Sequence, residues 1–125
     1  MIGFTASCFD LLHAGHIEML RECKYNCSYL IVGLNLNPTK KVPTQSAMER
    51  YVQIAGCKYV DEVIPYESEK DLENLLLLKR IDIRFLGEDY VGLKFTGDHL
   101  DIDIHYNDRN HGFSTSELRD RCKKN

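Results

Sequence analysis

The chain has 125 residues, which is close to the usual size of one domain. Its apolar residues (43%) and charged residues (28%) are typical of a globular protein, and its net charge of −3 argues against broad nucleic-acid binding. No apolar run approaches the roughly 20 residues of a membrane-spanning helix, and no basic and apolar signal segment opens the chain. We therefore expect one cytoplasmic domain over residues 1–125, with neither nucleic acid nor membrane as a partner.

The first half of the chain alternates between strand and helix patterns. Small and apolar residues predict a strand over residues 2–8, and an apolar stripe at helical spacing predicts a helix over 15–25. A continuous apolar run predicts a strand over 29–34 that is buried on both faces. A polar loop with two prolines, residues 35–43, leads to a capping box that starts a helix over 46–55.

The second half repeats the alternation. We expect a strand over residues 61–65, a leucine-rich helix over 71–79 and a strand over 83–86 that ends at a glycine. Residues 87–100 contain three glycines and mixed charges, which is typical of a loop. Strict alternation of polar and apolar residues over 101–106 then predicts a half-exposed edge strand.

The end of the chain carries a second helix start. A polar loop over residues 107–113 precedes a capping box, Ser114-Thr-Ser-Glu117, which predicts a last helix to about residue 123. Strands that alternate with helices imply right-handed βαβ units. The sequence thus predicts an α/β fold, a Rossmann-like, doubly wound and mostly parallel five-stranded sheet in a single domain.

The turn after the first predicted strand has the residues of an anion site. Two histidines flank a glycine, His13-Ala-Gly-His16, where the first helix begins. A helix start presents unpaired N–H groups and a partial positive charge, and Gly15 allows a ligand to approach the backbone. The two imidazoles add hydrogen-bond donors, so this turn predicts a phosphate site.

Polar clusters follow four of the predicted strands. Because the carboxyl ends of parallel strands meet at one edge, where ligands bind in such sheets, we expect these clusters to converge. The clusters are His13 with His16, Lys40 with Lys41, Gly87-Glu-Asp-Tyr90, and the segment from Arg109 to Thr115.

These segments resemble the nucleotidyltransferases with a His-x-Gly-His signature, and among them the glycerol-3-phosphate cytidylyltransferases. The resemblance covers nearly the whole chain and rests on four motifs in the expected order. They are Phe9-Asp-Leu-Leu-His-Ala-Gly-His16, Tyr59-Val-Asp-Glu-Val-Ile-Pro65, Gly87-Glu-Asp-Tyr90 and Arg109-Asn-His-Gly-Phe-Ser-Thr-Ser116. The second of these motifs is more typical of cytidylyl than of adenylyl transfer.

The resemblance implies an enzyme that transfers CMP from CTP to a small phosphorylated alcohol, such as glycerol 3-phosphate, and releases pyrophosphate. It also implies Mg²⁺ bridging the triphosphate, and a homodimer. The implied catalytic residues are His13, His16, Lys41 and Arg109. The implied nucleotide-binding residues are Ser7, Cys8, Phe9, His13, His16, Gly87, Asp89, Arg109, Ser114 and Thr115. The implied acceptor-binding residues are Asn37, Arg50, Lys58 and Asp61.

Other interpretations stay open. His13 can cap the first helix, and Asp10 can brace the turn instead of contacting a ligand. Five cysteines without a Cys-x-x-Cys pair favour reduced thiols, and we expect no residues that ligate a metal directly. Two other functions are conceivable: adenylyl transfer from ATP to a sugar phosphate or related acceptor, and nucleotide binding without catalysis.

Overall fold

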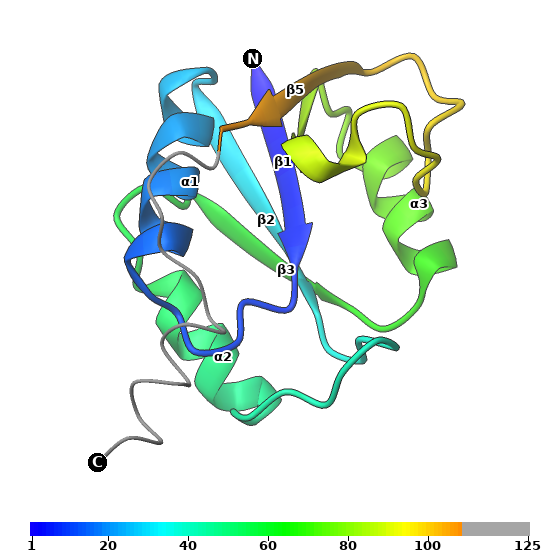
Figure 1. Cartoon of the computed structure of the whole chain (residues 1–125). Helices are drawn as coiled ribbons and strands as arrows, with labels where there is room; N and C mark the ends of the chain where they lie inside the picture. Colours follow the sequence, from blue (N-terminus) through cyan, green and yellow to red (C-terminus); the bar gives the residue numbers. More distant parts are fainter. Residues whose placement is uncertain (109–125) are drawn as a thin grey trace.

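Five parallel strands form one sheet in the part of the chain that our computed structural model describes, residues 1–108 (Figure 1). Their order across the sheet is β3-β2-β1-β4-β5. The strands are β1 (Ile2–Ser7), β2 (Tyr29–Asn35), β3 (Glu62–Tyr66), β4 (Ile83–Gly87) and β5 (Asp103–Asn107). This confirms the predicted Rossmann-like sheet, and β5 lies at its edge as predicted. The predicted helix after Ser114 lies outside the described residues.

Helices cover both faces of the sheet (Figure 1). The helices α1 (Ala14–Tyr25) and α2 (Ala47–Ala55) pack on one face, and α3 (Glu69–Leu78) packs on the other. The chain runs outward from β1 to β3 and then returns to the far side of β1 as β4. The strand order therefore reverses between β1 and β4, which is the place where sheets of this kind bind ligands.

The buried strand β2 joins the two apolar layers. Leu30, Val32 and Leu34 belong to the layer beneath α1 and α2, and Ile31 belongs to the layer beneath α3. This confirms the strand buried on both faces that its apolar run predicts. Gly33 is needed for close packing here, because a Cβ added to it would lie 2.7 Å from Cζ of Phe4.

The observed ends of most elements lie within about two residues of those expected. Helix α3 begins at Glu69, two residues earlier than predicted, because the Ser68 hydroxyl accepts the Asp71 N–H and caps it. The predicted loop over 87–100 contains a short 3-10 helix, η1 (Glu88–Tyr90). No helix within residues 1–108 is long and apolar enough to cross a membrane.

Candidate active site

A cavity of about 770 Å³ opens at the carboxyl end of the sheet, beside the reversal between β1 and β4. The last residues of four strands form its floor: Ser7 of β1, Asn35 of β2, Gly87 of β4 and Asn107 of β5. Segments that are far apart in the sequence thus meet at one place. Three of the four predicted polar clusters contribute to the lining, and the fourth, from Arg109, lies outside the described residues.

The start of α1 places both histidine rings at the cavity. The Gly15 N–H donates to Nδ1 of His13 at 2.9 Å, and the His13 N–H donates to Nδ1 of His16 at 3.2 Å. A ring nitrogen that accepts a hydrogen bond carries no proton, so the proton of each neutral ring lies on Nε2. The capping interpretation of His13 is thus confirmed, and the same ring also lines the cavity.

His16 is held in its neutral form. Burial is the largest effect that lowers its pKa, to about 4, and the positive charges of His13 and Lys41 lower it further against the opposing effect of Asp10. The ring therefore carries no charge at neutral pH and presents an N–H donor there. Such a group can donate to a phosphate oxygen while the positive charge of the site comes from other residues.

The turn between β1 and α1 is braced by Asp10. Its buried carboxylate accepts the N–H groups of Thr44 and Gln45, both at 2.9 Å, and the Gln45 side chain accepts the Leu11 N–H at 2.8 Å. The turn needs this support because Phe9 and Leu11 have φ values of 48° and 52°, which are unfavourable for residues with a side chain. The structural interpretation of Asp10 is confirmed.

The loop after β2 brings positive charge to the cavity. Lys40 and Lys41 are both exposed and both line it, next to Pro38 and Thr39. Because Asp10 ties residues 44 and 45 of the same loop to the turn before α1, the lysines and the histidines are held in one neighbourhood.

Arg50 has a structural role. Its side chain is 2% exposed, and its Nη1 donates to the carbonyl groups of Cys8 at 3.0 Å and Asn35 at 2.8 Å. Its Nη2 donates to the Leu36 carbonyl at 3.3 Å. The guanidinium thus joins the ends of β1 and β2 behind the cavity floor and is not part of the lining. We therefore do not retain Arg50 as an acceptor-binding residue.

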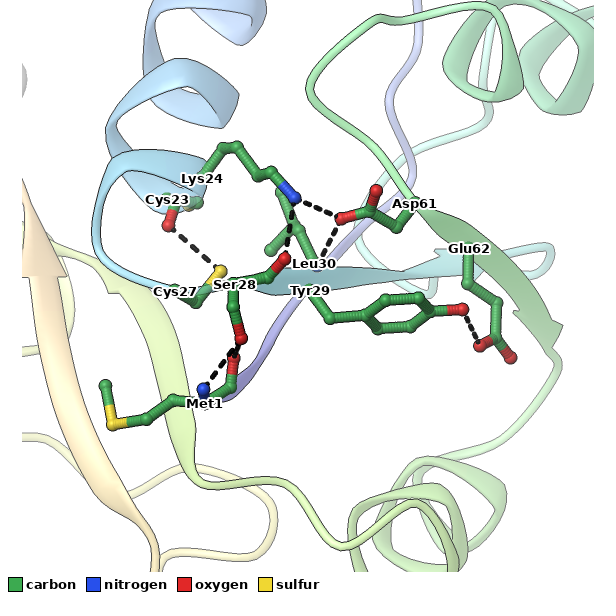
Figure 2. A network of polar contacts seen from close by, with 9 residues as sticks. All are labelled: Met1, Cys23, Lys24, Cys27, Ser28, Tyr29, Leu30, Asp61 and Glu62. Atoms are coloured by element: carbon green, nitrogen blue, oxygen red, sulfur yellow. Dashed lines mark hydrogen bonds and ion pairs between the residues drawn. The ribbon is translucent and has the colours of Figure 1, made fainter.

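Lys58 and Asp61 lie at the opposite, amino end of the sheet. The Asp61 carboxylate accepts Nζ of Lys24 at 2.6 Å and the Leu30 N–H at 2.8 Å (Figure 2). Lys58 precedes β3 in the same segment, and its Nζ lies 5.1 Å from the centre of the Tyr59 ring. These contacts fix the starts of β2 and β3 far from the cavity, so the structure does not bring Lys58 and Asp61 to it.

The other expected site residues divide into three groups. Ser7, Cys8, His13, His16, Lys41 and Gly87 line the cavity. Phe9 is buried in the core with its ring 5.8 Å from that of His16, and the exposed residues Asn37 and Asp89 are outside the lining. Arg109, Ser114 and Thr115 lie outside the described residues.

Sequence reasoning missed one wall of the cavity. It lies on the α3 side of the sheet, next to Tyr90 of the predicted cluster, and contains Tyr66, Glu69, Arg84 and Thr96. One signal for it was available, because an arginine stands inside the otherwise apolar segment Ile83–Gly87, where a buried strand was expected.

Comparison with protein families gives one match over most of the chain. The family model described as cytidylyltransferase-like matches residues 4–121. A curated relative from Campylobacter jejuni, named bifunctional protein HldE, is 34% identical over 98% of this chain. A Helicobacter pylori protein of the same name is 33% identical over 98%. This chain spans 28% of the length of each of these relatives.

Two solved structures share the fold. One is a lipopolysaccharide core biosynthesis protein from Thermoplasma volcanium, with a TM-score of 0.65, 24% identity, and coverage of 99% of this chain and 87% of that chain. The other is a pantoate-beta-alanine ligase from Francisella tularensis, with a TM-score of 0.59, 18% identity, and coverage of 98% and 69%.

Proposed function

Because the chain belongs to the cytidylyltransferase-like family of nucleotidyltransferases, we propose that it transfers CMP from CTP to a small phosphorylated alcohol, such as glycerol 3-phosphate. The products are a CDP-alcohol and pyrophosphate. One observation carries the proposal: the histidine pair at the start of α1, in which His16 is held neutral, lies in the same cavity as Lys40 and Lys41. A helix start, two N–H donors and two cations suit a triphosphate.

The reaction needs no general base. An oxygen of the acceptor's phosphate attacks the α-phosphorus of CTP, the bond from that phosphorus to the bridging oxygen breaks, and pyrophosphate leaves with the electron pair. The attacking phosphate is already ionised at neutral pH, since its second pKa is near 6. Catalysis then consists of positioning and of stabilising negative charge on the phosphate oxygens.

Each group at the cavity has a place in this scheme. Nε2–H of His13 and of His16 donates to the α-phosphate region, where charge increases as the new bond forms. Lys41 contributes positive charge to the α- and β-phosphates, and the backbone at Ser7 and Cys8 lies along the nucleotide. Arg109, Ser114 and Thr115, in the segment where the sequence predicts a helix start, would hold the outer phosphates.

Mg²⁺ fits the proposed site. This ion prefers oxygen ligands, keeps several waters, and is commonly held by substrate phosphates with one or two carboxylates. The carboxylate that the described residues offer at the end of β5 is Asp108, which lines the cavity. When bound, the ion supplies positive charge that offsets the charge of the triphosphate.

The experiment is a pyrophosphate-release assay with CTP and with ATP, each against a panel of phosphorylated alcohols and sugar phosphates. We expect turnover with CTP and a phosphorylated alcohol, and none with free glycerol, whose hydroxyl would need a base. The relatives' shared name, bifunctional protein HldE, specifies neither nucleotide nor acceptor. If the enzyme prefers ATP to CTP, the proposed cytidylyl transfer is replaced by the alternative, adenylyl transfer. CTP binding without pyrophosphate release from any pair would favour a non-catalytic module.

A substitution tests the role of the histidine pair. His16→Asn keeps an acceptor atom for the His13 N–H, which preserves the helix start, and removes the Nε2–H donor. Loss of one such donor typically lowers turnover by roughly a hundredfold. Circular dichroism and the melting temperature serve as the folding control. Near-normal turnover in a folded variant would contradict the role of His16.

A further inference from the structure

The α3 side of the cavity contains a buried cation that the proposed chemistry does not use. Arg84 lies on β4 in register with Phe4, which belongs to the apolar layer beneath α3. Its side chain therefore lies on the opposite face of the sheet from α1 and the histidine pair. Arg84 lines the cavity although it is only 5% exposed.

Most of the hydrogen-bonding capacity of this guanidinium is unused. Nη1 donates to the Thr96 carbonyl, which is the one hydrogen bond that the Arg84 side chain forms within residues 1–108. In the same part of the chain, the Nε of Arg50 is the one fully enclosed side-chain nitrogen or oxygen without a partner. Nε and Nη2 of Arg84 also lack a hydrogen-bond partner there, yet they are not fully enclosed, so both atoms remain accessible. The space that they reach is the cavity that Arg84 lines.

The contrast with Arg50 separates a structural arginine from a ligand-binding one. Both are nearly fully buried, but within residues 1–108 Arg50 donates to three backbone carbonyl groups, whereas the Arg84 side chain donates to one. Arg84 also forms no ion pair with the described carboxylates. A buried cation with unpaired donors is unfavourable, so a ligand that supplies oxygen atoms would gain strongly from binding there.

The surroundings of Arg84 define the chemistry of that ligand. Burial lowers the pKa of Arg84, against the opposing effects of Tyr66 and Glu69. One Glu69 oxygen accepts the Thr96 hydroxyl at 2.5 Å, and the Phe95 ring lies 5.1 Å from Cζ of Arg84. A fixed donor next to a carboxylate acceptor and an aromatic ring suits hydroxyl groups, because the carboxylate would repel a phosphate.

We propose that Arg84 is a specificity-determining residue for the acceptor, and that its Nε and Nη2 donate to oxygen atoms of the acceptor's hydroxyl-bearing tail. Glu69 accepts from the hydroxyls of the same tail. The reacting phosphate then points from this side toward the histidine pair, where the triphosphate lies. The inference rests on the proposed function and adds a residue that distinguishes a phosphorylated polyol from a phosphorylated alkyl chain.

The test compares two substitutions and two kinds of acceptor. Arg84→Gln removes the charge and the guanidinium fork, and Arg84→Lys keeps a cation that can still donate to the Thr96 carbonyl. Glycerol 3-phosphate and ribose 5-phosphate carry a hydroxylated tail, whereas propyl phosphate does not. Initial rates give kcat and KM for each acceptor and for CTP, and the melting temperature reports folding. Arg50→Lys is the control for a change at a buried structural arginine.

We expect both Arg84 variants to raise KM for the hydroxylated acceptors by about tenfold or more, as loss of a charged hydrogen bond does. KM for CTP and kcat/KM for propyl phosphate should change less than about twofold. Equal losses with propyl phosphate and glycerol 3-phosphate, the pattern expected of Arg50→Lys, would overturn the proposal. So would unchanged KM values. If Arg84→Gln does not fold, the same comparison of hydroxylated acceptors with propyl phosphate is made with Arg84→Lys and Glu69→Gln, and the same outcomes support or overturn the proposal.

A binding measurement separates this inference from the proposed reaction. Calorimetric titration with glycerol 3-phosphate, ribose 5-phosphate and propyl phosphate needs no turnover. If the wild-type chain releases no pyrophosphate but binds a hydroxylated phosphate at least tenfold more weakly after Arg84→Lys, the reaction fails and the role of Arg84 stands. If pyrophosphate is released but the variant binds every phosphate as the wild type does, the reaction stands and Arg84 has no such role.

Discussion

The depressed pKa of His16 predicts a specific loss of stability in acid. The folded chain holds this ring neutral until about pH 4, whereas the same ring takes up a proton near pH 6.5 when it is exposed. The unfolded state therefore binds more protons between these values, and the free energy of unfolding falls as the pH falls from 6.5 to 4. The full difference in pKa corresponds to about 3 kcal/mol, or about 2 kcal/mol after allowance for the partial exposure of the ring.

The effect can be isolated with His16→Asn, which keeps the acceptor for the His13 N–H but has no titrating ring. Urea unfolding of both proteins at pH 7.5, 6.5, 5.5 and 4.5, at constant ionic strength, gives the free energy of unfolding at each pH. His13, Asp10 and Lys41 are present in both proteins, so their own pH dependence largely cancels in the difference. The wild type should lose about 1 kcal/mol more than the variant between pH 6.5 and 4.5, because part of the full effect is lost outside this range.

Parallel curves for the two proteins would refute the reasoning. They would mean that His16 has the same affinity for protons in the folded and unfolded states, and hence that the ring is not shielded from water. A variant whose free energy of unfolding falls more in acid than that of the wild type would also refute it, because the difference would have the opposite sign. The prediction also concerns catalysis, because a ring that stays neutral down to about pH 4 should donate to phosphate without a change of charge between pH 5 and 8.

Three further substitutions test the packing and the corrected assignments. Gly33→Ala places a Cβ 2.7 Å from Cζ of Phe4 and should lower the free energy of unfolding by about 1–3 kcal/mol in urea titrations. Asp10→Ala leaves two backbone N–H groups without their acceptor and should cost about 2–4 kcal/mol in the same titrations, and turnover should fall because the lysine loop loses its tie to the turn. Asp61→Asn should cost less than about 1 kcal/mol and leave the acceptor KM unchanged in kinetic assays, because this partly exposed side chain pairs with Lys24 at the far edge of the sheet.

The elements of the fold were predictable because their signals are local. The apolar run in β2, the capping box at Ser46 and the paired histidines before α1 each depend on residues within one short segment. Parallel topology then follows from the alternation of strand and helix patterns, and it places the strand ends at one edge. The convergence of the histidines with Lys40 and Lys41 was therefore predictable without any knowledge of distances.

The corrections concern contacts between segments far apart in the sequence. Asp61 was expected at the acceptor, yet it precedes β3. It therefore lies at the amino end of the sheet, whereas the cavity lies at the carboxyl end. Its partners, Lys24 and the Leu30 N–H, are 37 and 31 residues away (Figure 2). No local pattern indicates such a partner, because it depends on which strands become neighbours.

Arg50 and Arg84 also show that the sequence alone does not reveal the contacts of a buried side chain, and here these contacts bear on function. From the sequence, Arg50 on a helix is a better candidate for a phosphate than Arg84 inside an apolar strand. The fold reverses this ranking, because the neighbouring ends of β1 and β2 supply Arg50 with carbonyl groups, whereas the reversal of strand order beside β4 leaves space above Arg84. A buried arginine is thus structural or ligand-binding according to how many of its donors the backbone occupies, which can be tested here by comparing these two residues in one chain.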